Sequence, residues 1–172
     1  MSKRVLVTEK LADAGLRLLR RDCEVTVRLA PTHDELVSLI GDYDALIVRS
    51  GTQVNAAVLN AGTRLVVVGR AGTGVDNIDV DAATHRGILV VNAPTSNTVA
   101  VAEHTMALML SLARHIPQSN ATMRLGQWKR SSFVGVEVRN KTLGIIGLGK
   151  VGSEVARRAA SFNMRLLGYD PY

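Results

Sequence analysis

The first half of the chain alternates short, β-branched apolar runs with stretches in which apolar residues recur at helical spacing. The apolar runs begin about every 20 residues, the spacing expected when each strand is followed by a short crossover helix. Residues 45–48 and 65–68 are apolar throughout, which is typical of parallel strands covered by helices on both faces. The pattern therefore predicts a doubly wound α/β sheet within residues 1–93, with strands at residues 4–8, 24–28, 45–49, 65–70 and 88–92.

Polar residues and glycines mark where the helices of this region begin and end. Thr32, followed three residues later by Glu35, is typical of a capping box in front of a helix. Gly62 and Gly87 stand where two further helices should stop. We expect both glycines to adopt the left-handed conformation that commonly closes a helix.

Pro94 ends this alternation, and the second half of the chain has a different pattern. Residues 98–116 form the longest helical candidate, which is apolar on most sides, so we expect it to be buried in its own domain or against a partner chain. We expect Pro117 to mark the end of this helix. The polar stretch 118–140 predicts a short helix and irregular backbone, and the remainder predicts a strand, a helix and a strand at residues 141–147, 150–162 and 164–170.

Composition narrows the class of protein. The 172 residues are 47% hydrophobic and 21% charged, which excludes a disordered or low-complexity chain. The net charge of +6 comes from scattered Lys and Arg, so we expect an anionic small molecule as partner and no nucleic acid. No apolar run reaches the roughly 20 residues of a membrane span. The single cysteine, Cys23, fits a reducing cytoplasm, and no group of His and Cys has the spacing of a metal site.

The clearest chemical motif lies between the last two predicted strands and reads Gly147-Leu148-Gly149-Lys150-Val151-Gly152. In dinucleotide-binding turns, the first glycine allows a tight turn, the second lets the backbone approach the pyrophosphate, and the third lets helix and strand pack closely. The N–H groups at the start of the helix then face the anion. Asp170 ends the next strand, where its carboxylate can accept both ribose hydroxyls and repel a 2′-phosphate, which favours NAD over NADP. The alternative is a glycine-rich turn that binds nothing.

Two further motifs follow predicted strands, and they read Arg49-Ser50-Gly51-Thr52 and Arg70-Ala71-Gly72-Thr73-Gly74-Val75-Asp76-Asn77. Ligands of open α/β sheets bind at the carboxyl ends of the strands. An arginine beside a hydroxyl suits a carboxylate or phosphate, and two glycines in three residues expose backbone N–H donors. Either motif alone is compatible with an ordinary turn, but their occurrence at strand ends of one sheet favours an anion-binding edge.

These motifs, together with Asn92-Ala93-Pro94 and Gly126-Gln127-Trp128, make the whole chain resemble the D-isomer-specific 2-hydroxyacid dehydrogenases. The resemblance implies the N-terminal part of a flavodoxin-like substrate-binding domain over residues 1–93, and over residues 94–172 an incomplete Rossmann NAD-binding domain that contains its first βαβ unit only. It implies oxidation of 3-phospho-D-glycerate to 3-phosphohydroxypyruvate, the first step of serine biosynthesis. The ending Gly168-Tyr169-Asp170-Pro171 favours this substrate, and reduction of glyoxylate or hydroxypyruvate is the alternative within the family.

The resemblance also assigns residues to a substrate and to NAD. The substrate would be held by Arg49, Ser50, Gly72 and Asn97. NAD would be held by Thr73, Gly147, Gly149, Lys150, Val151, Gly152 and Asp170, with Lys150 standing where the family more often has arginine. The predicted helix over residues 98–116 resembles the one these enzymes use in their dimer interface, which implies a homodimer.

No catalytic residue is assigned within the chain. Catalysis in the family uses an arginine and a histidine paired with a glutamate, all beyond the ribose-binding aspartate. The histidines of this chain do not substitute for them, because His33, His85 and His115 fit helix ends and His104 points away from Glu103. We therefore expect the chain alone to be inactive. The alternative is a truncated, non-catalytic module for NAD binding or dimerisation, which an in-frame continuation encoding the three missing residues would exclude.

Overall fold

The computed structural model describes residues 2–172, which divide into two compact units. The first unit ends at Ser96 and the second comprises Asn97–Tyr172. Each unit has a hydrophobic core of its own, so each is described by itself.

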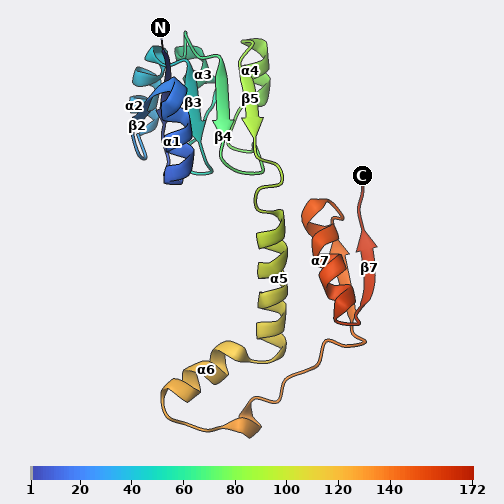
Figure 1. The fold of residues 1–172 in the computed structure, drawn as a ribbon. Helices are drawn as coiled ribbons and strands as arrows, with labels where there is room; N and C mark the ends of the chain where they lie inside the picture. Colours follow the sequence, from blue (N-terminus) through green and yellow to red (C-terminus); the bar gives the residue numbers. More distant parts are fainter. Residues whose placement is uncertain (1) are drawn as a thin grey trace. The chain divides into compact units, whose positions relative to one another are not determined.

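The first unit is built on a parallel sheet of five strands (Figure 1). The strands are β1 (Lys3–Val7), β2 (Cys23–Val27), β3 (Ala45–Val48), β4 (Val67–Arg70) and β5 (Leu89–Asn92). Their order, β2-β1-β3-β4-β5, is the flavodoxin-like order of a doubly wound sheet. The predicted fold class is confirmed.

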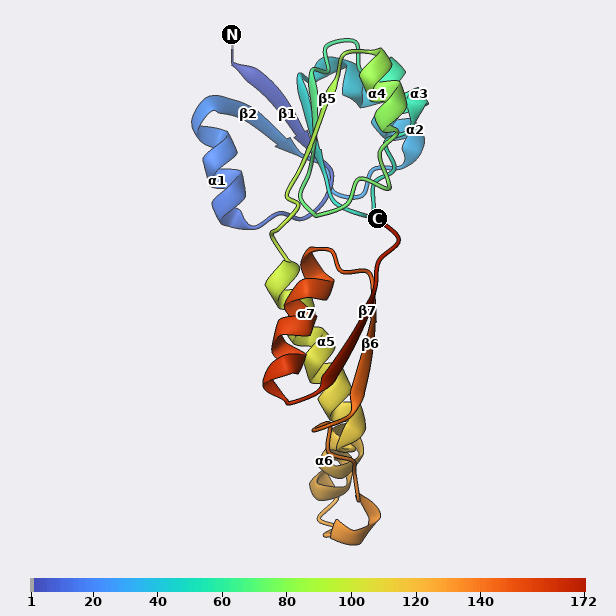
Figure 2. The same ribbon diagram turned by 90° about the vertical axis from the view of Figure 1, so that its right-hand side faces the viewer.

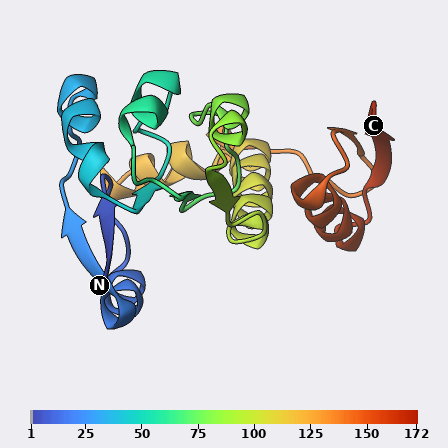
Figure 3. The same cartoon turned by 90° about the horizontal axis from the view of Figure 1, so that it is seen from above.

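Four helices cover this sheet: α1 (Asp13–Asp22), α2 (His33–Leu39), α3 (Ala56–Ala61) and α4 (Val80–His85). Figures 2 and 3 place α1 on one face and the other three helices on the opposite face. The main core lies between the sheet and these three helices, where Leu36, Leu46 and Leu59 are fully buried or nearly so. The two faces explain why the central strands are apolar at successive positions.

The predicted capping box is confirmed at the start of α2. The Thr32 side chain accepts from the Glu35 N–H at 3.3 Å, and the Glu35 carboxylate accepts from the Thr32 N–H at 2.9 Å. Gly87 has the expected positive φ of +66°, but Gly62, with φ of −73°, does not. A Cβ at Gly62 would lie 2.9 Å from the Cβ of Leu65, so glycine serves close packing there instead.

The second unit comprises α5 (Thr98–Ala113), α6 (Ile116–Arg124), a 3-10 turn (Arg130–Ser132), β6 (Thr142–Ile146), α7 (Lys150–Ser161) and β7 (Arg165–Tyr169). Strands β6 and β7 pair in parallel, and α7 connects them, so the three elements form one βαβ unit. Helix α5 packs against α7, and Ala102, Met106, Val155 and Ala159 form the core between them (Figure 2).

The long helix differs from its prediction at its C-terminal end. It stops at Ala113, and His115, with φ of +53°, separates it from α6. Pro117 therefore lies in the first turn of α6, where its missing N–H leaves no helical bond unmade, and does not end α5. His115 likewise precedes a helix rather than closing one.

Helix α5 is also only partly buried. Ala102 and Met106 face the core, whereas Leu108 and Leu112 are 58% and 77% exposed.

Within residues 2–172, no helix is long and apolar enough to cross a membrane.

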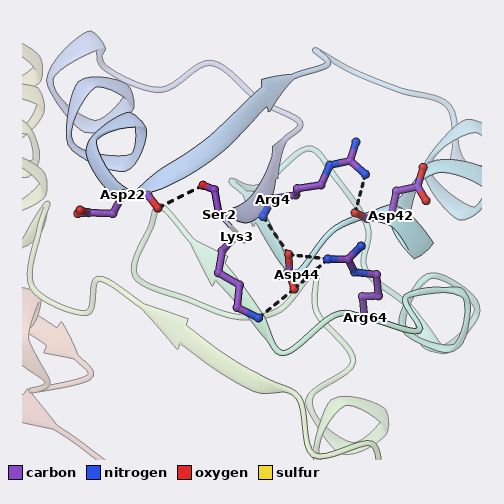
Figure 4. Close-up of polar contacts among 7 residues, drawn as sticks. All are labelled: Ser2, Lys3, Arg4, Asp22, Asp42, Asp44 and Arg64. Atoms are coloured by element: carbon purple, nitrogen blue, oxygen red, sulfur yellow. Dashed lines mark hydrogen bonds and ion pairs between the residues drawn. The ribbon is translucent and has the colours of Figure 1, made fainter.

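The amino ends of the central strands meet at one buried carboxylate, Asp44, just before β3 (Figure 4). It accepts from the Arg4 N–H at 2.9 Å, from Lys3 Nζ at 3.1 Å and from Arg64 Nη2 at 3.3 Å. The hydrogen bond from Arg4 and the two cations lower the pKa of Asp44 from 3.8 to about 2. The ionised carboxylate therefore stabilises the fold by tying β1, β3 and the loop before β4 together.

We expect Asp44→Asn to lower stability at neutral pH and to remove much of its acid dependence. The contribution of Asp44 is complete above its unfolded pKa of 3.8 and is lost as pH falls towards about 2. Urea unfolding midpoints at pH 7, 4, 3 and 2, chosen to bracket this window, measure the effect. Asp42→Asn is the matched control, because only the backbone carbonyl of Asp42 contacts Arg4. Parallel pH profiles for Asp44→Asn and the wild type would contradict the assignment.

Candidate functional site

The candidate site of the first unit lies at the carboxyl ends of β1, β3 and β4. Glu9 follows β1, the segment Arg49–Thr52 follows β3, and the segment Arg70–Asn77 follows β4. Because the strands are parallel, these three segments share one edge of the sheet, where ligands of such folds bind.

The Glu9 carboxylate holds the backbone of the segment after β3, which we call the 49–52 loop. Its Oε1 accepts from the N–H groups of Arg49 at 2.8 Å and Thr52 at 3.0 Å, and its Oε2 accepts from that of Gly51 at 3.0 Å. Partial burial disfavours the ionised form, but these donors outweigh it and lower the pKa of Glu9. The carboxylate is therefore ionised at neutral pH and occupies three donors of the loop.

The role of Glu9 as acceptor for the 49–52 loop was not predicted from the sequence. Its only signal was an acidic residue directly after an apolar strand, and strand register decides what such a residue meets. For residues 49–52 the sequence predicted an anion site from the Arg49 and Ser50 side chains, and the N–H groups of this loop are occupied by the protein's own carboxylate.

The segment after β4 is also engaged internally. Arg70, whose side chain is 9% exposed, donates to Asp76 at 2.9 Å and to the Arg49 carbonyl at 3.3 Å. A Cβ at Gly74 would lie 2.7 Å from Arg70 Nη1, so any larger residue there would have to displace this pair. Asn77 Nδ2 donates to the carbonyls of Arg49 at 2.8 Å and Thr52 at 2.6 Å. Arg70 and Asn77 therefore support the neighbouring loop.

The predicted substrate-binding residues fall into two groups. Arg49 and Ser50 are exposed, and within residues 2–172 their side chains make no hydrogen bond, so both are free to meet a ligand. Gly72 lies on the adjacent loop, where its N–H donates to the Arg70 carbonyl and its own carbonyl accepts from the Ala93 N–H. Asn97 belongs to the second unit, at the start of α5.

The second unit has the strand, glycine turn and helix of a dinucleotide-binding motif. Gly147 has φ of +91°, and Gly149 precedes the first turn of α7, which begins without a side-chain cap. A Cβ at Gly152 would lie 2.0 Å from the Gly147 carbonyl oxygen, so only glycine fits there. Lys150 is exposed and Val151 is half-buried against the core.

Asp170 lies beside this turn. Its Oδ2 accepts from the Leu148 N–H at 2.5 Å, and its Oδ1 accepts from the Tyr172 N–H at 3.2 Å. The Leu148 side chain covers Gly168, where a Cβ would lie 2.7 Å from Leu148 Cδ1. A hollow of about 470 Å³ next to the turn is lined by Gly147, Gly149, Lys150, Gly152 and Thr105, among others. Thr73, also predicted to contact the cofactor, belongs to the first unit.

Two histidines of the first unit have hydrogen-bond partners of their own. His33 pairs with the Asn55 side chain at 3.2 Å, and His85 with the Asp81 carbonyl at 2.8 Å. Among the described residues 2–172, no three His, Cys, Asp or Glu side chains are arranged to hold a metal ion.

The fold and the glycine turn define an α/β protein with a flavodoxin-like sheet followed by a βαβ unit of dinucleotide-binding type. Residues 5–166 match the family described as D-isomer specific 2-hydroxyacid dehydrogenase, catalytic domain. The chain belongs to this family, as the resemblance of its motifs predicted.

Individual relatives agree with this assignment. The chain is 50% identical to a D-3-phosphoglycerate dehydrogenase of Methanocaldococcus jannaschii, over 98% of this chain and 32% of that protein. It therefore spans about a third of the length of that relative. Its structure resembles that of the TT0316 protein of Thermus thermophilus, with a TM-score of 0.92 and 34% identity over 98% of this chain and 56% of that one. It also resembles the NAD⁺-bound 3-phosphoglycerate dehydrogenase of Entamoeba histolytica, with a TM-score of 0.78 and 28% identity over 99% of this chain and 55% of that one.

Proposed function

We propose that the protein oxidises 3-phospho-D-glycerate to 3-phosphohydroxypyruvate with NAD. The observation that carries this proposal is the 50% identity to a D-3-phosphoglycerate dehydrogenase across both the anion-binding edge and the glycine turn. The residues at these two places have the chemistry that a doubly anionic substrate and a dinucleotide require.

At the substrate edge, Arg49 and Ser50 are proposed to bind an anionic group. A guanidinium next to a hydroxyl suits a carboxylate or a phosphate, and both side chains are exposed at the carboxyl end of β3. Gly72, on the loop after β4, would let the substrate approach the backbone, and Asn97 would contribute from the second unit. The N–H groups of the 49–52 loop do not take part, because Glu9 occupies them.

At the glycine turn, the residues fit a dinucleotide. The first turn of α7 has no side-chain cap, so its N–H groups are available to a pyrophosphate, and Lys150 adds a positive charge. Gly147, Gly149 and Gly152 leave room for it, and Val151, which lines the same hollow, would contact it as well. Asp170 has further lone pairs for a ribose diol, and Thr73 would contact the cofactor from the first unit. When bound, NAD supplies the hydride acceptor.

We further propose a homodimer in the cytoplasm. Leu108 and Leu112 leave an apolar face of α5 exposed, which a second copy would cover. Light scattering of the purified protein tests this, and a monomer at micromolar concentration would contradict it. The compartment rests on the single, reduced Cys23 alone.

The product of the complete gene should form NADH from 3-phosphoglycerate and NAD⁺, followed by absorbance. Residues 1–172 expressed alone should form none, because the resemblance to the family assigns no catalytic arginine, histidine or glutamate within them. NADH consumption with glyoxylate or hydroxypyruvate, without oxidation of 3-phosphoglycerate, would assign the protein to another branch of the family. A measurable rate from residues 1–172 would contradict the expected inactivity.

Asp170→Asn should shift cofactor preference from NAD towards NADP. The amide oxygen still accepts from Leu148 N–H, but the charge that binds the ribose diol and repels a 2′-phosphate is lost. Losing a hydrogen bond to a charged group predicts about tenfold weaker NAD binding. Calorimetric titration of the complete protein with NAD⁺ and NADP⁺ measures both affinities. Glu137→Gln, which removes an exposed carboxylate elsewhere in the same unit, is the control, and an unchanged NAD affinity in Asp170→Asn would refute the role.

A further inference from the structure

The 49–52 loop is fixed from two opposite sides by residues outside it. Glu9, after β1, takes the N–H groups of Arg49, Gly51 and Thr52. Asn77, after β4, donates to the carbonyls of Arg49 and Thr52 at 2.8 and 2.6 Å. The loop backbone is thus held between two side chains that follow β1 and β4, and these are the two strands that neighbour β3 in the sheet.

The backbone of Arg49 is held on both its N–H and its carbonyl side. Its N–H donates to Glu9, and its carbonyl accepts from both Asn77 and Arg70 Nε. Its guanidinium, in contrast, makes no hydrogen bond within residues 2–172. The position of this side chain is therefore set by its own backbone, and the backbone is set by Glu9 and Asn77.

A buried pair of hydroxyls anchors the far end of the loop. Thr52 Oγ1 lies 2.9 Å from Thr8 Oγ1, and both residues are buried. Because Thr8 precedes Glu9, the same turn of chain after β1 contacts the loop through a carboxylate and a hydroxyl. Such support matters for binding, because side chains already held in the binding geometry lose less conformational entropy when the ligand binds.

We propose that Glu9 and Asn77 are positioning residues that hold the 49–52 loop so that Arg49 and Ser50 meet the anionic group of the substrate, without touching substrate themselves. This inference rests on the proposed function. It predicts that loss of either residue weakens substrate binding and leaves NAD binding unchanged.

Glu9→Gln tests the proposal in the complete gene product. Its amide nitrogen must face at least one N–H donor of the loop, so the KM for 3-phosphoglycerate should rise about tenfold, with kcat and the KM for NAD changing less than about twofold. Asn77→Asp, which turns two carbonyls towards a carboxylate, should have the same effect. Glu24→Gln makes the matching change on an exposed residue of β2 and should leave all three constants unaltered.

Two further measurements separate positioning from general stability. In an Arg49→Ala background, Glu9→Gln should no longer change the KM for 3-phosphoglycerate, because the effect passes through Arg49. Amide hydrogen exchange at Arg49, Gly51 and Thr52 should accelerate in Glu9→Gln whether or not substrate is turned over, since these N–H groups bond to Glu9.

The outcomes separate the positioning role of Glu9 and Asn77 from the proposed function on which it rests. An unchanged KM in Glu9→Gln, or equal rises in the KM for substrate and for NAD, overturns the positioning role while leaving the dehydrogenase assignment intact. A wild-type protein that oxidises no 2-hydroxy acid overturns the proposed function and, with it, the role of the loop in binding substrate.

Discussion

Parallel pairing of β1, β3 and β4 is the constraint on which the first unit depends. In the register of the sheet, Val7 pairs with Ile47, and Ile47 pairs with Gly69. Two residues beyond these positions stand Glu9 and Arg49, which are far apart in sequence but adjacent at the edge. A shift of one residue in the β1–β3 pairing would turn the Glu9 side chain to the other face of the sheet and leave the loop N–H groups without their acceptor.

The two ends of this sheet use a carboxylate in the same way for different purposes. At the amino end, Asp44 is surrounded by two cations and a backbone donor, and its ionisation stabilises the junction of three segments. At the carboxyl end, Glu9 accepts from three backbone N–H groups of the 49–52 loop, and it fixes the loop without neutralising Arg49. The two cations at the amino end are paired with Asp44, whereas the Arg49 guanidinium at the carboxyl end is left free for a ligand.

Local patterns predicted the elements well because they depend on neighbouring residues. The strands of the first unit lie within two residues of their expected bounds, and the Thr32–Glu35 capping box is present. Errors occurred where packing overrides local preference: Gly62 serves close contact with Leu65, and the left-handed His115 ends one helix before Pro117 begins another. Glu9 and Asn77 were missed for a related reason, since their partners are set by strand register and not by spacing along the chain.

The two glycine-containing loops are prepared for anions in opposite ways. In the 49–52 loop, one internal carboxylate occupies three N–H donors, so an incoming anion must be met by the side chains of Arg49 and Ser50. At the glycine turn, Asp170 takes only the Leu148 N–H, which precedes the helix, and the first N–H groups of α7 are left without a side-chain cap. There the backbone itself can bind an anion. Composition alone does not separate these cases; the number of donors already occupied by the protein's own carboxylate does.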